Sequence, residues 1–156
     1  CLVVPKGHSL TNLKHCSLET IAEHPIVTYT TEFTGRSKVD DAFKQRNLIP
    51  NLVFSAVDSD VIKTYVRVGF GVGLIAGFSY DELLDHDLVK IDASHLFSSS
   101  VTSVSFRVGT FLRGYMHAFI RELAPHLGRE LVLEAASRTK LADRATLFKG
   151  IELPSY

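Results

Sequence analysis

Small hydroxyl side chains cluster where a predicted strand turns into a predicted helix. The stretch TTEFTGRSKVDDAF occupies residues 30–43, and Thr34 is expected to cap the helix that follows. The backbone N–H groups of Gly35, Arg36 and Ser37 would then point out of the first helical turn, where the positive end of the helix dipole favours an anion. This arrangement could hold a sulfate or a carboxylate. The alternative is a capping threonine with solvated neighbours.

The strand before this turn adds further hydroxyl groups. Thr28 and Thr30 lie near its end and could give neutral hydrogen bonds to the same ligand, while Gly35 lets a ligand approach the backbone closely. Arg36 on its own could equally form a surface ion pair. The candidate binding residues for a small anion are Thr28, Thr30, Thr34, Gly35, Arg36 and Ser37.

Other reactive residues lack the spacing that catalysis or metal binding needs. The two cysteines and seven histidines form no zinc-binding pattern and no disulfide scaffold. Cys16 follows His15, but no third group is evident that would orient a catalytic pair. Asp58 and Asp60 precede an apolar helix and are expected to cap it. We therefore predict no catalytic residues, no metal and no cofactor.

The glycine-rich segment GFGVG, residues 69–73, superficially resembles a dinucleotide-binding loop. Such loops follow a strand and open a helix, whereas here a helix is predicted before the glycines and a strand after them. Gly69 is expected to end the helix, and the other glycines are expected to allow tight packing.

Composition indicates an ordinary globular chain. Its 156 residues suggest one domain, and its 17 basic and 17 acidic side chains cancel, so no overall basic field points to nucleic acid. No apolar run reaches the roughly 18 residues that span a bilayer, and two isolated cysteines fit a cytoplasmic protein. The first residues, Cys1–Pro5, resemble a strand in progress, so we expect the chain to begin inside a fold.

Hydrophobic periodicity predicts alternating strands and helices. A capped helix is expected between Ser17 and His24, and four more are expected over residues 34–47, 58–68, 111–123 and 130–138, with a further one over 140–148. Strands are expected over residues 2–4, 25–30, 52–57, 72–76, 88–91 and 101–108. Aromatic residues at helical spacing are expected in the core. The order is that of an α/β sheet followed by a helical tail.

Four long runs resemble the C-terminal half of the CysB-like group of LysR-type transcriptional regulators. They are VTYTTEFTGRSKVDDAF, VFSAVDSDVIKTYVRVGFGVGLIA, FRVGTFLRGYMHAFIRELAPHL and LFKGIELP. The resemblance implies a type 2 periplasmic-binding-protein-like fold, in which two α/β subdomains enclose an effector. It assigns residues 1–97 to a nearly complete distal subdomain and residues 98–126 to a crossing strand and part of the proximal subdomain. Residues 127–156 would form a helical C-terminal tail.

The same resemblance implies a function. The chain would be the effector-binding portion of a cytoplasmic, non-enzymatic regulator of sulfur assimilation and cysteine biosynthesis. Its effector would be sulfate, O-acetylserine or N-acetylserine, and Thr34 matches a threonine through which the family binds it. The sequence departs from the family pattern at Thr31 and Glu32, where the family has an aromatic residue and a glycine. A carboxylate at Glu32 would repel an anion if it faced the cleft.

Partners also follow from the resemblance. DNA would be contacted by an N-terminal helix-turn-helix outside this chain, in a homo-oligomer, with no membrane involved. Two alternatives stay open: an exported solute-binding protein for a small anion, and an enzyme that uses Cys16.

Overall fold

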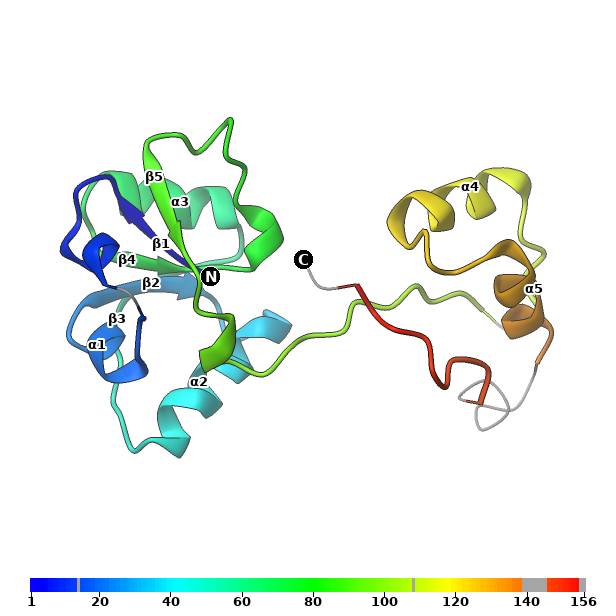
Figure 1. The fold of residues 1–156 in the computed structure, drawn as a ribbon, viewed down its shortest axis with the longest axis horizontal. Coiled ribbons are helices and arrows are strands. Elements are labelled where there is room, and N and C mark those ends of the chain that lie inside the picture. The colour runs from blue at the N-terminus through cyan, green and yellow to red at the C-terminus, as the bar shows by residue number, and fades with distance from the viewer. Residues whose placement is uncertain (14, 108, 139–145, 155–156) are drawn as a thin grey trace. The chain divides into compact units, whose positions relative to one another are not determined.

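The computed structural model describes residues 1–13, 15–107, 109–138 and 146–154. The chain divides into two compact units, residues 1–100 and residues 101–156. The first unit is a sheet with helices on both faces, and the described residues of the second form helices and extended segments (Figure 1).

The sheet of the first unit has five strands in the order β3-β2-β4-β1-β5. Strand β2 runs parallel to both of its neighbours, β3 and β4, whereas β1 runs antiparallel to β4 and β5. The carboxyl ends of β2, β3 and β4 therefore meet at one edge of the sheet. The strands are β1 (Leu2–Pro5), β2 (Pro25–Tyr29), β3 (Asn51–Ala56), β4 (Val72–Leu74) and β5 (Leu88–Ile91).

Helices cover both faces because alternate residues of each strand point in opposite directions. On one face, Ile26 packs in a core with Ile21 and Phe43. On the other face, Val27 packs in a second core with Ile62 and Val66. The helices that supply these residues are α1 (Leu18–Ala22), α2 (Thr34–Gln45) and α3 (Ser59–Arg67), and short 3-10 turns occur at Ser9–Asn12, Gly77–Ser79 and Ser94–Leu96.

Several predicted helix and packing signals are confirmed. The Asp58 side chain caps α3 by accepting a hydrogen bond from the backbone N–H of Asp60 at 2.6 Å. Gly69 follows α3 with φ +80°, a backbone conformation that favours glycine. A Cβ on Gly73 would lie 2.6 Å from Val3 Cγ2 and 2.9 Å from Val66 Cγ2, so glycine is what lets α3 and β1 approach β4.

A buried ion-pair cluster holds the segment between β4 and β5 against α3. Lys63 Nζ lies 2.7 Å from Asp85 Oδ2, and both residues are buried. Arg67 adds contacts of 2.8 Å to Asp85 and 2.7 Å to Asp87. Lys63 also donates to the backbone oxygen of Ser79 at 2.9 Å.

The second unit departs from prediction at its first segment. Residues 101–107 form no strand, and residue 108 of the predicted strand lies outside the described residues. The alternation itself is present, because Val104 and Phe106 pack against a small core of Leu112, Ile120 and Val132. No described strand pairs with the segment, so no ladder of hydrogen bonds forms.

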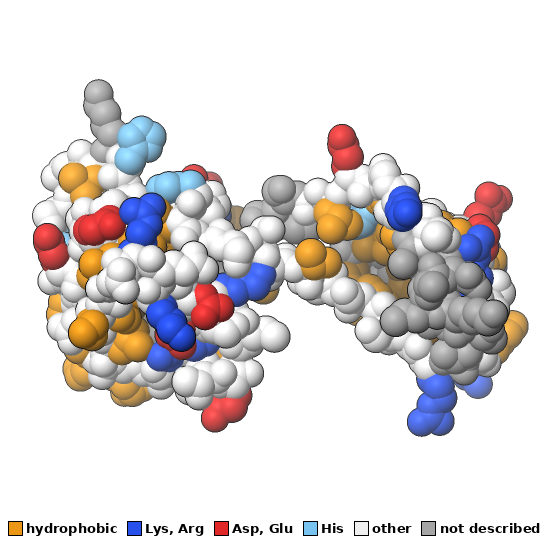
Figure 2. Space-filling model, turned by 90° about the horizontal axis from the view of Figure 1, so that it is seen from below, with side chains coloured by type: hydrophobic (Ala, Val, Ile, Leu, Met, Phe, Trp, Pro, Cys, Tyr) orange, Lys and Arg blue, Asp and Glu red, His pale blue; other side chains and the backbone are white. Residues whose placement is uncertain are grey.

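The prediction that an aromatic stripe on the first helix of this unit lies in the core is wrong. Helix α4 spans Gly114–Leu123 and is followed by α5 at Arg129–Ser137. The unit's own core is built on Ile120, with Met116 packed beside it. The predicted stripe is instead 47 to 84 % exposed at Phe111, Tyr115, Phe119 and Leu123. Hydrophobic side chains reach the surface of both units on the face in Figure 2.

The last predicted helix, over residues 140–148, falls largely on residues 139–145, outside the described part of the chain. Among the residues that the structure describes, no helix is long and apolar enough to cross a membrane.

Candidate functional site

The turn between β2 and α2 lies at the edge where three parallel strands end. The backbone N–H of Thr30 donates to Ala56 O at 3.0 Å, which ties the end of β2 to the end of β3. The N–H of Phe33 then donates to Thr30 O at 3.1 Å and closes the turn. Ligands of α/β sheets bind outside the carboxyl ends of strands, so the turn stands where a binding site is expected.

The residue that caps α2 is Phe33, and the predicted Thr34 cap is wrong. Phe33 has an extended backbone and makes no side-chain capping bond. Its ring instead stacks on the ring of Tyr29, with centroids 3.9 Å apart and planes 13° apart. This contact brings the chain into the helix one residue earlier than the hydroxyl pattern predicts, and Thr34 becomes the first helical residue.

The first helical turn leaves two backbone donors available. The N–H of Arg36 donates to Phe33 O at 2.9 Å, so it is already used. The N–H groups of Thr34 and Gly35 have no acceptor among the described residues. The exposed Thr34 hydroxyl makes no hydrogen bond to these residues either. These groups stand at the positive end of the α2 dipole.

Gly35 is shaped by the same aromatic contact. A Cβ at this position would lie 3.2 Å from Phe33 Cε1, which is a tight contact with a ring already stacked on Tyr29. The Tyr29 hydroxyl in turn accepts the N–H of Ala76 at 3.1 Å. The roles of Tyr29 and Phe33 are not predicted from the sequence, in which the one signal for them is a pair of aromatic residues on either side of the turn.

The polar side-chain atoms of the other three predicted residues are engaged within the protein. Thr28 is fully buried, and its hydroxyl donates to Leu74 O at 2.9 Å. Arg36 turns inward, where Nη1 donates to Tyr29 O at 2.6 Å. The Ser37 hydroxyl donates to the backbone oxygen of Thr34 at 3.1 Å.

Thr30 and Glu32 complete the turn with opposite properties. The Thr30 hydroxyl oxygen is buried and has no hydrogen-bond partner among the described residues. Glu32 is exposed, and its own backbone N–H, followed by the nearby Thr30 hydroxyl, lowers the pKa of its carboxyl. The Thr30 hydroxyl contributes to this lower pKa although it forms no hydrogen bond to the carboxylate. Glu32 therefore carries a negative charge within the turn that leads into α2.

Catalytic and metal chemistry gain no support from the described residues. Burial raises the pKa of the Cys16 thiol, against a smaller opposing effect of the Ser17 backbone, whereas a nucleophilic cysteine needs a lowered one. No group of three or more His, Cys, Asp or Glu side chains in the described residues could hold a metal ion.

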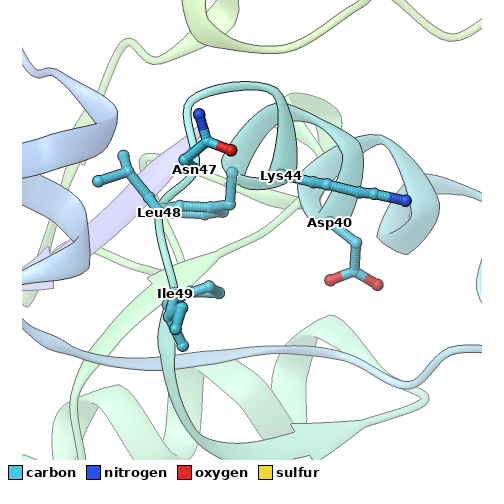
Figure 3. Close-up of a pocket in the computed structure, with 7 residues that line it drawn as sticks. Asp40, Lys44, Asn47, Leu48 and Ile49 are labelled. Atoms are coloured by element: carbon cyan, nitrogen blue, oxygen red, sulfur yellow. The ribbon is translucent and has the colours of Figure 1, made fainter.

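A surface hollow lies at the other end of α2 and does not coincide with the candidate site. It has a volume of about 420 Å³ and is lined by Asp40, Lys44, Asn47, Leu48 and Ile49, among others. Figure 3 shows Asp40 and Lys44 projecting from α2 beside Leu48 and Ile49 of the following segment. Its lining mixes one acid and one base with apolar groups, so it offers no cradle for an anion.

Comparison with known proteins identifies the family. Residues 1–128 match the family model of the LysR substrate binding domain. The chain is 46 % identical over 152 residues to the HTH-type transcriptional regulator CysB of Haemophilus influenzae, covering 97 % of this chain and 47 % of that protein. It is 50 % identical over 126 residues to the regulator SsuR of Burkholderia cenocepacia, covering 81 % and 41 %.

A solved structure agrees with these relatives. The cofactor-binding domain of the Cbl transcriptional regulator superposes with a TM-score of 0.73 at 36 % identity, covering 88 % of this chain and 60 % of that one. The chain spans less than half the length of the two regulators above. Both of these relatives are named as HTH-type transcriptional regulators. The chain belongs to the LysR substrate-binding domain family, with its type 2 periplasmic-binding-protein-like fold, and is related to the regulators CysB, Cbl and SsuR.

Proposed function

We propose that this chain is the effector-binding portion of a LysR-type transcriptional regulator of sulfur assimilation and cysteine biosynthesis. Support comes from the three related regulators and from the domain type that the fold shares with Cbl. In this role the protein acts in the cytoplasm as a homo-oligomer. Its DNA contacts are made by a helix-turn-helix segment outside this chain.

The effector site is the amino end of α2. The observation that carries this proposal is a set of unused polar groups in one turn: the N–H groups of Thr34 and Gly35, the Thr34 hydroxyl and the buried Thr30 hydroxyl. Such a set matches the acceptor oxygens of sulfate or of an acetylserine carboxylate.

The remaining predicted residues take supporting positions in this proposal. The polar side-chain atoms of Thr28, Arg36 and Ser37 are engaged within the protein, so they fix the shape of the turn. Arg36 also adds a positive charge beneath it, which Asp40 partly balances at 2.8 Å.

The regulatory step is a shift between two conformations. An effector changes the balance between them only by binding one more tightly than the other. A ligand at the amino end of α2 would contact a helix whose N-cap residue, Phe33, is stacked on Tyr29 at the end of β2. The Tyr29 hydroxyl accepts a hydrogen bond from the N–H of Ala76, two residues after β4. Binding of the effector would therefore affect the conformation of the strand ends that surround the site.

Replacement of Thr34 by valine tests the site. Calorimetric titration of the full-length protein with sulfate and with N-acetyl-L-serine should show binding weakened about tenfold or more, because one hydrogen bond to a charged ligand is lost. Thr64→Val is the matched control, since Thr64 is exposed on α3 and its hydroxyl donates to Asp60 O. Unchanged affinity in Thr34→Val, or an equal loss in the control, would refute the site.

A further inference from the structure

Lys38 of α2 holds the segment through which the chain leaves the first unit. The first unit ends at residue 100, and residues 97–100 form its junction segment. Lys38 Nζ donates a hydrogen bond to the backbone oxygen of Ser99 in this segment. Figure 1 shows the chain passing beside α2 at this point, just after the 3-10 turn Ser94–Leu96. The helix that carries the proposed site is therefore bonded to the junction segment.

Apolar packing anchors the start of the junction segment. Phe97 is half-buried and packs, together with Leu96, against the core cluster that contains Phe43 of α2. Val39, which follows Lys38 in α2, packs against the same cluster. Residues 98–100 are exposed, so apolar packing ends at Phe97. The hydrogen bond from Lys38 thus adds a polar contact two residues beyond that point.

Lys38 also lies on the face of α2 that bears the proposed site. Thr34 and Lys38 are four residues apart in one helix, and residues at this spacing are neighbours on a helical face. The Cα–Cβ bond of a helical residue is tilted toward the amino end, which for Lys38 is the direction of Thr34. The contact with the junction segment therefore lies one helical turn from the unused donors.

The charge of Lys38 is available to a ligand. Among the described residues, no carboxylate forms an ion pair with it. Arg36, the other cation of the first two turns of α2, is buried and donates to Tyr29 O. An ammonium group has three donors, and the bond to Ser99 uses one of them. Two donors of Lys38 are left for an anion.

We propose that Lys38 binds the anionic effector and the junction segment at the same time, so that occupation of the site tightens the contact between α2 and residues 97–100. One donor of the ammonium group stays on Ser99 O, and another bonds an oxygen of the anion held by the N–H groups of Thr34 and Gly35. The coupling is reciprocal, because a ligand that strengthens a contact is bound more tightly when that contact is formed. This inference rests on the proposed effector site.

Two measurements on the full-length protein test the bridge. Sulfate is the probe, added in place of chloride at constant ionic strength. Calorimetry should show sulfate binding weakened about fivefold in Lys38→Met, because one unit charge at about 4 Å in water contributes about that factor. Chymotrypsin cleavage after Phe97, identified by mass spectrometry, reports local opening of the junction segment. Sulfate should slow this cleavage in the wild type and have little effect on it in Lys38→Met.

Matched variants control for charge alone. Lys38→Arg keeps a cation with several donors, so it should retain most of the sulfate affinity and the protection at Phe97. Lys44→Met removes an exposed positive charge farther along α2 and should behave as the wild type in both measurements. An equal loss of sulfate affinity in Lys44→Met and Lys38→Met would reduce the effect to net charge and overturn the bridge.

The outcomes separate failure of this inference from failure of the site. If Thr34→Val weakens sulfate binding while Lys38→Met leaves the affinity and the protection at Phe97 unchanged, the role of Lys38 is overturned and the site stands. If Lys38→Met speeds cleavage but keeps the sulfate affinity, Lys38 only anchors the junction segment and the inference is again overturned. If Thr34→Val leaves sulfate binding unchanged, the site and the inference fall together.

Discussion

The guanidinium of Arg36 lies beneath the turn that leads into its own helix, with Nη1 2.6 Å from the backbone oxygen of Tyr29. The arginine is 8 % exposed, and Nε lies 2.8 Å from Asp40 Oδ1. This contact joins the last residue of β2 to the first turn of α2. The position of the Thr34 and Gly35 donors therefore depends on a buried charge that is turned away from them.

Replacement of Arg36 by glutamine should destabilise the protein. The change leaves the Tyr29 carbonyl without its donor, so we expect the free energy of unfolding to fall by about 1–3 kcal/mol in urea denaturation. Arg46→Gln is the control, because Arg46 pairs with Glu19 at 3.4 Å on the surface and such pairs contribute little. An equal loss of unfolding free energy in the two variants would show that the buried contact stabilises the protein no more than the surface pair does.

Gly73→Ala should be costly for a steric reason. The added methyl would lie 2.6 Å from Val3 Cγ2 and 2.9 Å from Val66 Cγ2, and overpacking of this kind costs about 1–3 kcal/mol. Gly114→Ala meets no atom within 4 Å and should be neutral or slightly stabilising, since alanine favours helix. Urea denaturation of both variants measures the contrast, and a neutral Gly73→Ala would contradict the packing at β4.

Asp85 should give stability a dependence on acid pH. Burial alone raises the pKa of its carboxyl, but hydrogen bonds from Lys63, the Asp81 backbone and Arg67 outweigh burial and hold that pKa below its ordinary value. Its contribution is therefore complete above the unfolded-state pKa of about 4 and is lost as the pH falls through the folded-state pKa.

Asp85→Asn tests that dependence. It should lower the free energy of unfolding by about 3 kcal/mol at pH 7, because Lys63 loses its buried partner and keeps the exposed Asp60 at 2.9 Å. It should also flatten the decline in unfolding free energy between pH 5 and pH 2. Asp41→Asn changes an exposed residue of α2 and should keep the wild-type decline. If the unfolding free energy of Asp85→Asn declines with falling pH as steeply as that of the wild type, the pH dependence does not come from Asp85.

The first unit was predictable because its signals are local. The β-branched run at residues 25–30 and the helical spacing after it correspond to β2 and α2, and Asp58 caps α3 as its sequence position indicates. The start of α2 was not predictable from the hydroxyl pattern, because it depends on the stacking of Phe33 on Tyr29. The inward turn of Arg36 likewise depends on the end of a strand seven residues away.

The second unit shows the limit of periodicity. Spacing identified an apolar stripe on α4 but could not identify what the stripe contacts, and Phe119 is 63 % exposed while Ile120 is buried. The alternation over residues 101–107 likewise reflects packing of Val104 and Phe106, because a strand also needs a partner that periodicity does not supply.

Titration of the ¹⁵N-labelled full-length protein with O-acetyl-L-serine, followed by amide NMR shifts, tests the central claim most directly. The backbone N–H groups of Thr34 and Gly35 should shift and saturate with the binding curve, because they are the donors that the effector occupies. The N–H of Arg36, already bonded to Phe33 O, should shift less. Saturable binding that leaves the Thr34 and Gly35 amides unmoved would contradict an effector site at the amino end of α2.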